Sequence, residues 1–251
     1  MKILVAGKGG AGKTTVSGTI ARALAQAGET VVAVDADVNP MLGISLGVGM
    51  KETERLSGVR EAQQGGGVEH PDDAESMLAT FGITAPDGVR LVVGSRMDAM
   101  DPGCPGLGMT PDRLLRELGG DGRIVIGDLE AGSGIVTRMD PGDIDLVLVI
   151  TDPTSKSIEV ARRAARSASA RGADVLVIAN RIDADDDLDG IRAALHEYEI
   201  VVLPEDHAIR HADEQGLAPI GVSQNTPGML VLRELARRLA VRAAIPAVAP
   251  G

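Results

Sequence analysis

The stretch GKGGAGKTT, residues 7–15, decides the fold. It matches the pattern G-x-x-x-x-G-K-[ST], in which successive backbone N–H groups surround the phosphates of a nucleotide. The last lysine of this pattern, Lys13, reaches the β- and γ-phosphates, and the hydroxyl of Thr14 binds Mg²⁺. An apolar run at residues 3–7 leads directly into the loop, and a helical pattern follows it, which places the phosphates at a helix N-terminus. The predicted phosphate-binding residues are Gly9, Gly10, Ala11, Gly12, Lys13, Thr14 and Thr15.

A second lysine, Lys8, stands in the same loop at a position that the general pattern leaves open. The chain has five lysines against twenty arginines, so two of its five lysines share one short loop. Lys8 is therefore either a solvated loop residue or a residue with a chemical role of its own. The general pattern does not distinguish the two interpretations.

Composition limits the classes of partner. The chain has 251 residues, 44% of them hydrophobic, and we expect a single domain over residues 1–251. The formal net charge is −11, whereas binding to duplex DNA rests on many phosphate contacts from Lys and Arg. Aromatic residues make up only 1% of the chain, so base stacking on aromatic side chains is essentially lacking. We therefore expect no nucleic-acid partner.

The sequence also predicts a cytoplasmic protein without a membrane span. No apolar run reaches the roughly 20 residues of a membrane span, and the N-terminal apolar run turns into the glycine loop after six residues. A single cysteine excludes an intrachain disulfide and agrees with a reducing compartment. The helical pattern at residues 227–245 carries four arginines but no Lys, Trp or Phe, so we expect it to pack on a sheet and not on a membrane surface.

Short apolar runs alternate with longer helical patterns along the chain. The runs are apolar on nearly every residue, which is typical of strands buried on both faces of a parallel sheet. The segments 14–28, 154–172 and 188–199 read as crossover helices. We therefore predict a doubly wound α/β domain, a P-loop NTPase fold with a mostly parallel sheet and helices on both faces. Residues 48–88 show no sustained period and contain the glycine cluster QQGGG (63–67), so we expect a mobile excursion there. The predicted strands are residues 3–7, 31–35, 89–94, 123–128, 145–151, 173–180 and 199–204.

The glycine loop resembles the deviant Walker A loop of the MinD/ParA/ArsA/nitrogenase-iron-protein class of ATPases. In that class the additional lysine reaches across a nucleotide-sandwich dimer to the phosphates bound by the partner. The resemblance implies that the chain binds ATP and Mg²⁺ and forms a homodimer on binding ATP. It also implies that Lys8 acts in trans, where it neutralises charge that develops during phosphoryl transfer.

The stretch VVAVDADVNPML, residues 31–42, resembles switch I of this class. The resemblance implies that Asp37 orients the attacking water and that Asp35 stands near the magnesium shell. The alternative is that both carboxylates only form a turn at the end of a strand.

The stretch IGDLEAGSG, residues 126–134, resembles switch II. Asp128 closes a predicted strand, where an acidic residue holds the waters of the bound ion. The resemblance likewise places Asp128 on the magnesium side, and it implies that Gly132 gives the backbone freedom to respond to a γ-phosphate.

The base pocket is predicted from two further strand ends. Asn180 resembles the residue that hydrogen-bonds the base in this class, and Pro204 with Glu205 resembles the second wall of the pocket. Arg181 either stacks on the base or is solvated. The run from Asn180 to Asp183 differs by one residue from the N-K-x-D sequence that reads guanine, with Asp183 as the acceptor. The sequence is therefore also consistent with a metallochaperone GTPase, as an alternative to an ATPase.

Among subfamilies, the chain resembles the CooC-type accessory ATPases, which mature nickel enzymes such as carbon monoxide dehydrogenase. The resemblance is carried by DADVNP (35–40), DLEAG (128–132), residues 157–161 and the cysteine segment DPGCPGLG (101–108). It implies an ATPase that inserts a metal into a client metalloenzyme. The implied partner is that client enzyme or an accessory protein. The metal site of that family resembles C-x-C, whereas Cys104 has no second cysteine two residues further on.

Cys104 is thus either a transition-metal ligand or an ordinary small loop residue. One thiolate cannot make a tight site for a soft ion, which prefers about two to four sulfur or nitrogen ligands. The subfamily resemblance implies that this segment lies at the two-fold axis. Two Cys104 thiolates would then meet, with Met97, Met100 or Met109 as weak thioether ligands for Ni²⁺ or Zn²⁺.

Two other interpretations complete the predictions. A positioning or partitioning ATPase of the MinD/ParA kind would bind a membrane or DNA as an ATP dimer, but the acidic charge and the loop cysteine favour metal-centre maturation. His207 and His211 have the i, i+4 spacing that metal sites use, yet no third ligand is evident. We expect them on a surface helix near the nucleotide pocket.

Overall fold

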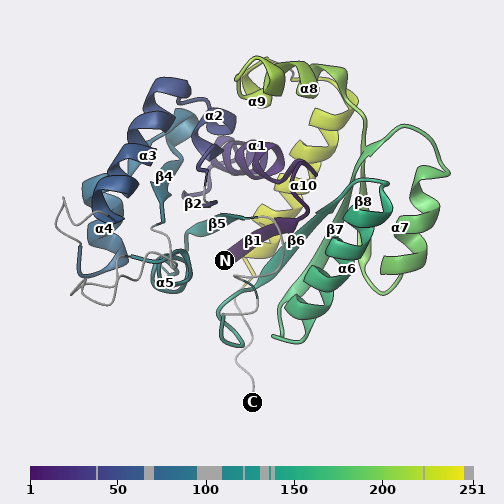
Figure 1. Ribbon diagram of the computed structural model, residues 1–251, viewed down its shortest axis with the longest axis horizontal. Coiled ribbons are helices and arrows are strands. Elements are labelled where there is room, and N and C mark those ends of the chain that lie inside the picture. The colour runs from purple at the N-terminus through teal and green to yellow at the C-terminus, as the bar shows by residue number, and fades with distance from the viewer. Residues whose placement is uncertain are drawn as a thin grey trace.

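One sheet carries the fold of the computed structural model (Figure 1). The structure describes residues 1–37, 39–64, 71–94, 109–120, 122–130, 136, 139–222 and 224–245, and only the backbone of residues 59–64. Within these residues the strands are β1 (Lys2–Gly7), β2 (Val31–Ala36), β3 (Ile83–Thr84), β4 (Arg90–Val93), β5 (Ile124–Leu129), β6 (Leu146–Thr151), β7 (Asp174–Ile182) and β8 (Glu199–Pro204). Their order is β3-β4-β2-β5-β1-β6-β7-β8, and every neighbouring pair is parallel except β3 with β4.

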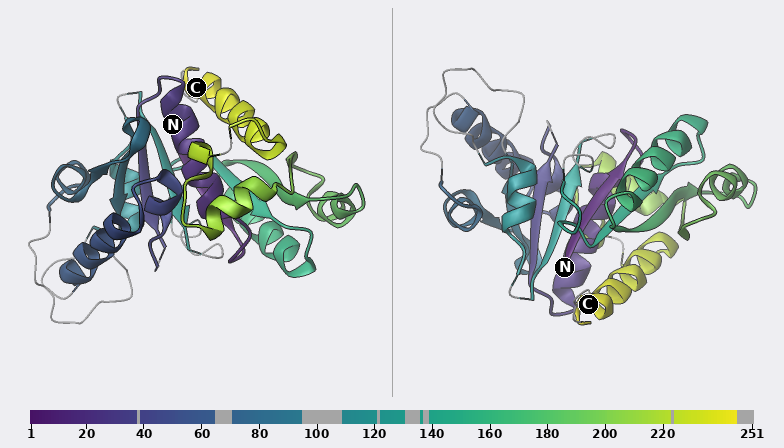
Figure 2. Two further views of the ribbon diagram at one scale, coloured as in Figure 1. Left: turned by 90° about the horizontal axis from the view of Figure 1, so that it is seen from above. Right: turned by 90° about the horizontal axis from the view of Figure 1, so that it is seen from below.

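Helices cover both faces of the sheet. They are α1 (Lys13–Gln26), α2 (Leu42–Leu46), α3 (Met50–Gln64), α4 (Ala74–Phe81), α5 (Pro111–Glu117), α6 (Ser155–Ser169), α7 (Asp187–Leu195), α8 (His207–Glu214), α9 (Pro219–Val222) and α10 (Pro227–Ala243), with a 3₁₀ turn η1 (Pro86–Gly88). Figure 2 shows the yellow α10 and the teal-green α6 on opposite sides of the strands. The predicted doubly wound α/β fold is confirmed.

The apolar runs form strands because both of their faces are buried. Along β1, Ile3 belongs to the core under α1 and α10, whereas the next residue, Leu4, belongs to the core under α4, α5, α6 and α7. Each run of the sequence prediction corresponds to one strand of the sheet. The short strand β3 was not predicted, because its two residues, Ile83 and Thr84, are too few to show a period.

Residues 48–88, expected to be a mobile excursion, contain more regular structure than the sequence predicts. All of α3, α4, β3 and η1 lie within this stretch. Leu56 of α3 is buried in the core under α1, and Met77 of α4 is buried in the opposite core. The mobility itself stays a prediction, and the glycines at 65–67 lie outside the described residues.

The final helix packs on the sheet, as the sequence predicts. Leu232, Leu235 and Leu239 of α10 are buried in the core that α10 shares with α1. Three of its arginines form ion pairs at the surface, namely Arg237 with Glu234 at 2.7 Å, Arg238 with Glu199, and Arg242 with Asp174. Among the helices that the structure describes, none combines the length and the apolar composition of a membrane span.

The topology brings the predicted site residues to one edge of the sheet. The glycine loop follows β1, and the switch I stretch follows β2. Asp128 lies near the end of β5, Asn180 near the end of β7, and Pro204 ends β8. Since these strands are parallel, their carboxyl ends lie at the same edge, which is where doubly wound sheets bind ligands.

Candidate nucleotide-binding site

The glycine loop presents the start of α1 to the carboxyl edge of the sheet. Gly12 is the N-cap of α1 and has a positive φ of 100°, and no side chain caps the N–H groups of the first helical turn. These N–H groups are the donors that bind phosphate at a helix N-terminus. A Cβ atom at Gly12 would lie 2.4 Å from Nδ2 of Asn180, so this position needs glycine for both its backbone angle and its space.

The two loop lysines occupy different environments. Lys13 is only 7% exposed, and its Nζ lies 3.5 Å from the backbone oxygen of Lys8. The ammonium of Lys8 is at the surface, 3.4 Å from the carbonyl oxygen of Gly9. Lys8 is partly exposed, a position that suits a solvated lysine as well as one that reaches another chain, so the role of Lys8 in trans stays a prediction.

Asp128 lies behind Lys13 with two hydroxyl groups around it. The Ser17 hydroxyl lies 3.2 Å from Oδ1 of Asp128 and 2.8 Å from the carbonyl oxygen of Lys13. The Thr14 hydroxyl is also hydrogen-bonded to the Asp128 carboxylate. Burial raises the pKa of Asp128, and the Thr14 hydrogen bond, the Lys13 charge and the Ser17 hydrogen bond act in the opposite direction.

Asp35 is the register partner of Asp128 on the neighbouring strand. Both residues are 1% exposed. Burial, together with the negative charge of Asp128, raises the pKa of Asp35. The Asp35 carboxylate also accepts hydrogen bonds from the backbone N–H groups of Asp37 (3.1 Å) and Leu42 (2.8 Å). Asp35 therefore holds both ends of the switch I loop.

Asp37 makes a turn contact of its own, because its Oδ1 accepts a hydrogen bond from the backbone N–H of Asn39 at 2.9 Å. The carboxylates of Asp35 and Asp37 thus form the strand-end turn that the sequence offers as an alternative. These turn contacts do not preclude catalysis. The orientation of a water molecule by Asp37 stays a prediction.

The donor set at this edge suits Mg²⁺. The structure brings together the Thr14 hydroxyl and the carboxylates of Asp128 and Asp35, next to the Lys13 ammonium. Oxygen donors of this kind are the ligands that Mg²⁺ prefers, and two buried carboxylates side by side are stabilised by a cation. The residues predicted for Mg²⁺ therefore fit that ion.

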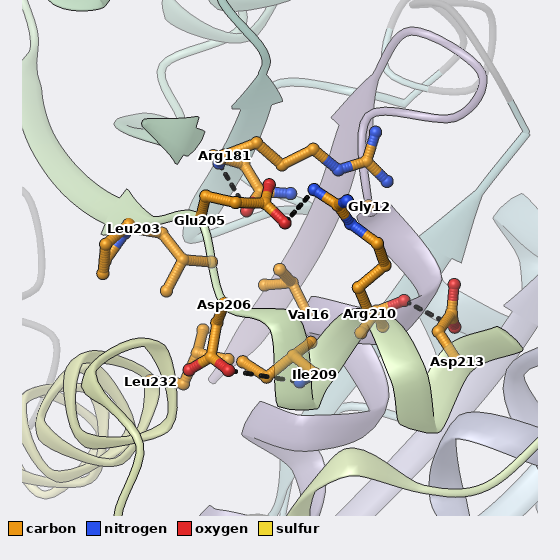
Figure 3. Close-up of a pocket in the computed structure, with 13 residues that line it drawn as sticks. Gly12, Val16, Arg181, Leu203, Glu205, Asp206, Ile209, Arg210, Asp213 and Leu232 are labelled. Atoms are coloured by element: carbon orange, nitrogen blue, oxygen red, sulfur yellow. Dashed lines mark hydrogen bonds and ion pairs between the residues drawn. The ribbon is translucent and has the colours of Figure 1, made fainter. Parts of the chain in front are cut away.

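A pocket beside the loop gathers the residues predicted to bind the base (Figure 3). The Asn180 side chain is fixed there, since its Nδ2 donates to the Ala11 carbonyl at 2.7 Å and its Oδ1 accepts from the Arg181 N–H at 3.0 Å. Arg181 has a positive φ of 61°, which is uncommon for a residue with a side chain. The lining residues are Gly12, Thr15, Val16, Asn180, Arg181, Leu203, Pro204, Glu205, Asp206, Ile209, Arg210, Asp213 and Leu232.

Helix α8 supplies pocket residues that the sequence analysis missed. Arg210 forms an ion pair with Glu205, and the Asp213 carboxylate accepts a hydrogen bond from the Thr15 hydroxyl at 3.0 Å. The contact of Asp213 with Thr15 joins segments that are distant in sequence, and the contact of Arg210 with Glu205 lies across a turn, so no local pattern predicts either of them. His207 and His211 are exposed on the same helix, which agrees with the surface position predicted for them.

Asp206 connects two helices at the edge of the pocket through hydrogen bonds. Its Oδ1 accepts N–H groups of Ala208 (3.0 Å) and Ile209 (3.2 Å) in α8, and its Oδ2 accepts the N–H of Gly228 (3.0 Å) in α10. A single aspartate before a helical pattern is an N-cap signal that could have identified it. Partial burial acts to raise the pKa of Asp206, but the Thr226 hydrogen bond and then these backbone hydrogen bonds outweigh that effect and lower the pKa.

We expect Asp206→Ala to lower the free energy of unfolding by about 2 kcal/mol at neutral pH, because one helix cap and a second backbone hydrogen bond are lost. Because the pKa of Asp206 is lower in the folded protein, its carboxylate contributes fully to stability at pH values above the unfolded-state pKa of about 3.9. The contribution is lost as the pH falls through the folded-state pKa. Urea unfolding at neutral and acidic pH measures both effects. Asp186→Ala is the control, since Asp186 is an N-cap whose side chain makes no cap hydrogen bond. Equal effects of the two variants would contradict the assignment.

Several predicted residues lie outside the described residues, namely Met97, Met100, Cys104 and Gly132. In the described part of the chain, no group of three or more His, Cys, Asp or Glu side chains is placed to hold a metal ion. The proposed thioether role of Met109 is wrong, because Met109 is 2% exposed and packs in the core with α5. Its side chain is therefore not available at a surface.

Comparisons with known proteins agree with this geometry. The family model CbiA, described as the CobQ/CobB/MinD/ParA nucleotide binding domain, matches residues 2–220. The carbon monoxide dehydrogenase accessory protein CooC of Rhodospirillum rubrum is 29% identical over 236 residues, which cover 87% of this chain and 89% of that protein. The cell division ATPase MinD of Pyrococcus furiosus has a similar structure, with a TM-score of 0.70 and 20% identity over 96% of this chain and 99% of that chain.

The septum site-determining protein MinD of Pyrococcus horikoshii OT3, solved with Mg-ADP, gives a TM-score of 0.71 at 19% identity, over 98% of this chain and 99% of that chain. At such low identity the two structures establish the fold alone, and the family model establishes the family. The geometry agrees with this match, because a P-loop begins α1 and two strand-end carboxylates lie behind that loop. The chain belongs to the CobQ/CobB/MinD/ParA nucleotide-binding domain family.

Proposed function

We propose that the chain is an ATP-dependent dimerising switch, which hydrolyses ATP to drive metal insertion into a client enzyme. The observation that carries the proposal is the buried Lys13 of the glycine loop beside two buried strand-end carboxylates, Asp35 and Asp128. The same loop has a second lysine, Lys8, which is partly exposed. The similarity to CooC over 87% of the chain supports metal-centre maturation as the purpose of the switch.

The residues of the chain divide the work of hydrolysis. The N–H groups at the start of α1 and the Lys13 ammonium bind and orient the phosphates. Thr14, Asp128 and Asp35 would hold Mg²⁺, which supplies positive charge to the phosphate oxygens when bound. Asp37 orients the attacking water, and Lys8 of a second copy neutralises charge that develops on the transferred phosphoryl group.

Metal binding by Cys104 is the test of the metal role. We expect about one nickel, zinc or copper ion per two chains in the ATP-closed state, because a soft ion prefers about two to four sulfur or nitrogen ligands and each chain has one thiolate to contribute. By thermodynamic linkage, bound metal then stabilises the dimer by the same free energy by which dimerisation strengthens metal binding. Elemental analysis of gel-filtered protein with and without ATP measures the stoichiometry.

Cys104→Ser is the variant, because serine keeps the size and removes the thiolate. It should lose the dimer-dependent metal while it keeps nucleotide binding and hydrolysis. Equal metal content in wild type and Cys104→Ser, or no metal in the closed state, overturns the metal role. An ATPase that docks on its client would then remain.

A further inference from the structure

The pocket that faces the base lacks aromatic side chains. The chain has one Phe, one Tyr and no Trp, and neither aromatic residue lines the pocket. A purine there meets aliphatic walls and the polar side chains of Asn180, Arg181, Glu205 and Arg210. Base identity must therefore be read by hydrogen bonds and charge at this rim, not by stacking on an aromatic platform.

Glu205 is the acidic group best placed for that purpose. Its backbone N–H donates to the Ile182 carbonyl at 2.9 Å, so the strand end fixes its position. Its side chain is 13% exposed, and it is paired with Arg210, whose side chain is 49% exposed. Figure 3 shows the two side chains meeting in the pocket, with the Arg181 side chain nearby. Arg210 is thus the more exposed partner of a partly buried carboxylate.

A free carboxylate at this place would favour guanine. The N1–H and 2-amino groups of guanine are two donors side by side, which match the two oxygens of a carboxylate. Adenine presents only one donor group, its 6-amino group, beside the acceptor N1, whose lone pair a carboxylate repels. An arginine that pairs with the carboxylate neutralises its charge and occupies its lone pairs, so the advantage for guanine is lost.

The acceptor expected from the N-K-x-D comparison does not take this place. Asp183 is exposed and is not among the residues that line the pocket. Its backbone N–H donates to the Asp187 carboxylate at 2.9 Å, in the turn before α7. Three carboxylates line the pocket, and two of them are engaged elsewhere: Asp206 accepts three backbone N–H groups, and Asp213 accepts the Thr15 hydroxyl. Glu205 is therefore the carboxylate best placed to face the edge of a purine, and its partner Arg210 decides whether it does so.

We propose that Arg210 determines the base preference of the nucleotide site. By holding Glu205 in an ion pair, Arg210 keeps a carboxylate off the purine edge and makes the site selective for adenine over guanine. This inference rests on the proposed nucleotide-binding function, and it adds a residue that determines specificity.

The test compares dissociation constants for ATP, GTP and ITP, measured by competition against a fluorescent nucleotide. Wild type should prefer ATP. Arg210→Ala should shift the ratio of GTP to ATP affinity about tenfold toward GTP, because one charged hydrogen-bonding group becomes available to the base. ITP, which lacks the 2-amino group, should gain less than GTP. The double variant Arg210→Ala/Glu205→Gln should lose the shift, since the carboxylate is gone.

Two further variants separate this role from folding. Arg210→Lys keeps a cation beside Glu205 and should retain most of the preference for ATP. Arg237→Ala removes an arginine of α10 that pairs with Glu234 away from the pocket, and it should leave the ratio unchanged. An equal loss of ATP and GTP affinity in Arg210→Ala overturns the inference, as does a wild type that binds both equally. A wild type that binds no nucleotide contradicts the proposed function itself.

Discussion

Lys13→Ala should abolish Mg-dependent ATP hydrolysis, with a loss of at least about 100-fold in kcat. Lys13 is nearly buried, and its charge acts on Asp128 while its ammonium lies within the phosphate loop. Alanine leaves the β- and γ-phosphates without this cation and leaves the two buried carboxylates, Asp35 and Asp128, without its charge. Phosphate release under saturating Mg-ATP measures the effect.

Lys51→Ala is the matched control for this prediction. Lys51 is an exposed lysine of α3, so its removal should leave the rate unchanged. Thermal unfolding of both variants shows whether the Lys13 variant is folded. A folded Lys13→Ala protein that retains activity within a few-fold of wild type would contradict the assignment of the phosphate loop.

Lys8→Ala has the second large expected effect. If Lys8 acts on the phosphates held by a partner, the variant monomer should bind ATP with nearly normal affinity but lose ATP-dependent dimerisation and hydrolysis together. The expected loss of rate is about 1,000-fold, comparable with the removal of an arginine finger. The partly exposed Lys8, whose ammonium donates to the Gly9 carbonyl of its own loop, makes this separation of binding from turnover possible.

A mixture of two inactive variants gives the sharper test of the same residue. In a mixed dimer of Lys8→Ala and Asp37→Ala chains, one composite site combines an intact Asp37 with an intact Lys8 from the other chain. Part of the activity should return in that mixture. If mixed dimers form, as mass measurement can establish, but remain inactive, Lys8 does not act across the interface.

Sequence patterns were sufficient for every described strand except the short β3, and for the phosphate loop. The apolar runs predict strands because a parallel strand buries both faces, and the spacing of Gly7, Gly12 and Lys13 identifies the loop without any tertiary contact. Helix α3 was missed because its residues lack a clear apolar stripe, with Leu56 as its main buried contact. In this case tertiary packing stabilises a helix that local periodicity does not predict.

The fine structure of the site depends on contacts that no local sequence pattern predicts. The pairing of Asp35 with Asp128 follows from the register of β2 and β5, and the raised pKa values follow from the burial of both residues. The ion pair of Arg210 with Glu205 depends on the turn between β8 and α8. Met109 was misplaced for a related reason, because a methionine in a loop-like sequence gave no sign that it packs in the core.

The mass of the Asp37→Ala protein with Mg-ATP tests the central claim, an ATP-driven dimer, most directly. This variant is expected to bind ATP without cleaving it, so the closed state should accumulate. Light scattering during gel filtration should give twice the monomer mass with ATP and the monomer mass with ADP. A protein that remains monomeric while demonstrably bound to ATP, at concentrations well above the ATP dissociation constant, would contradict the account.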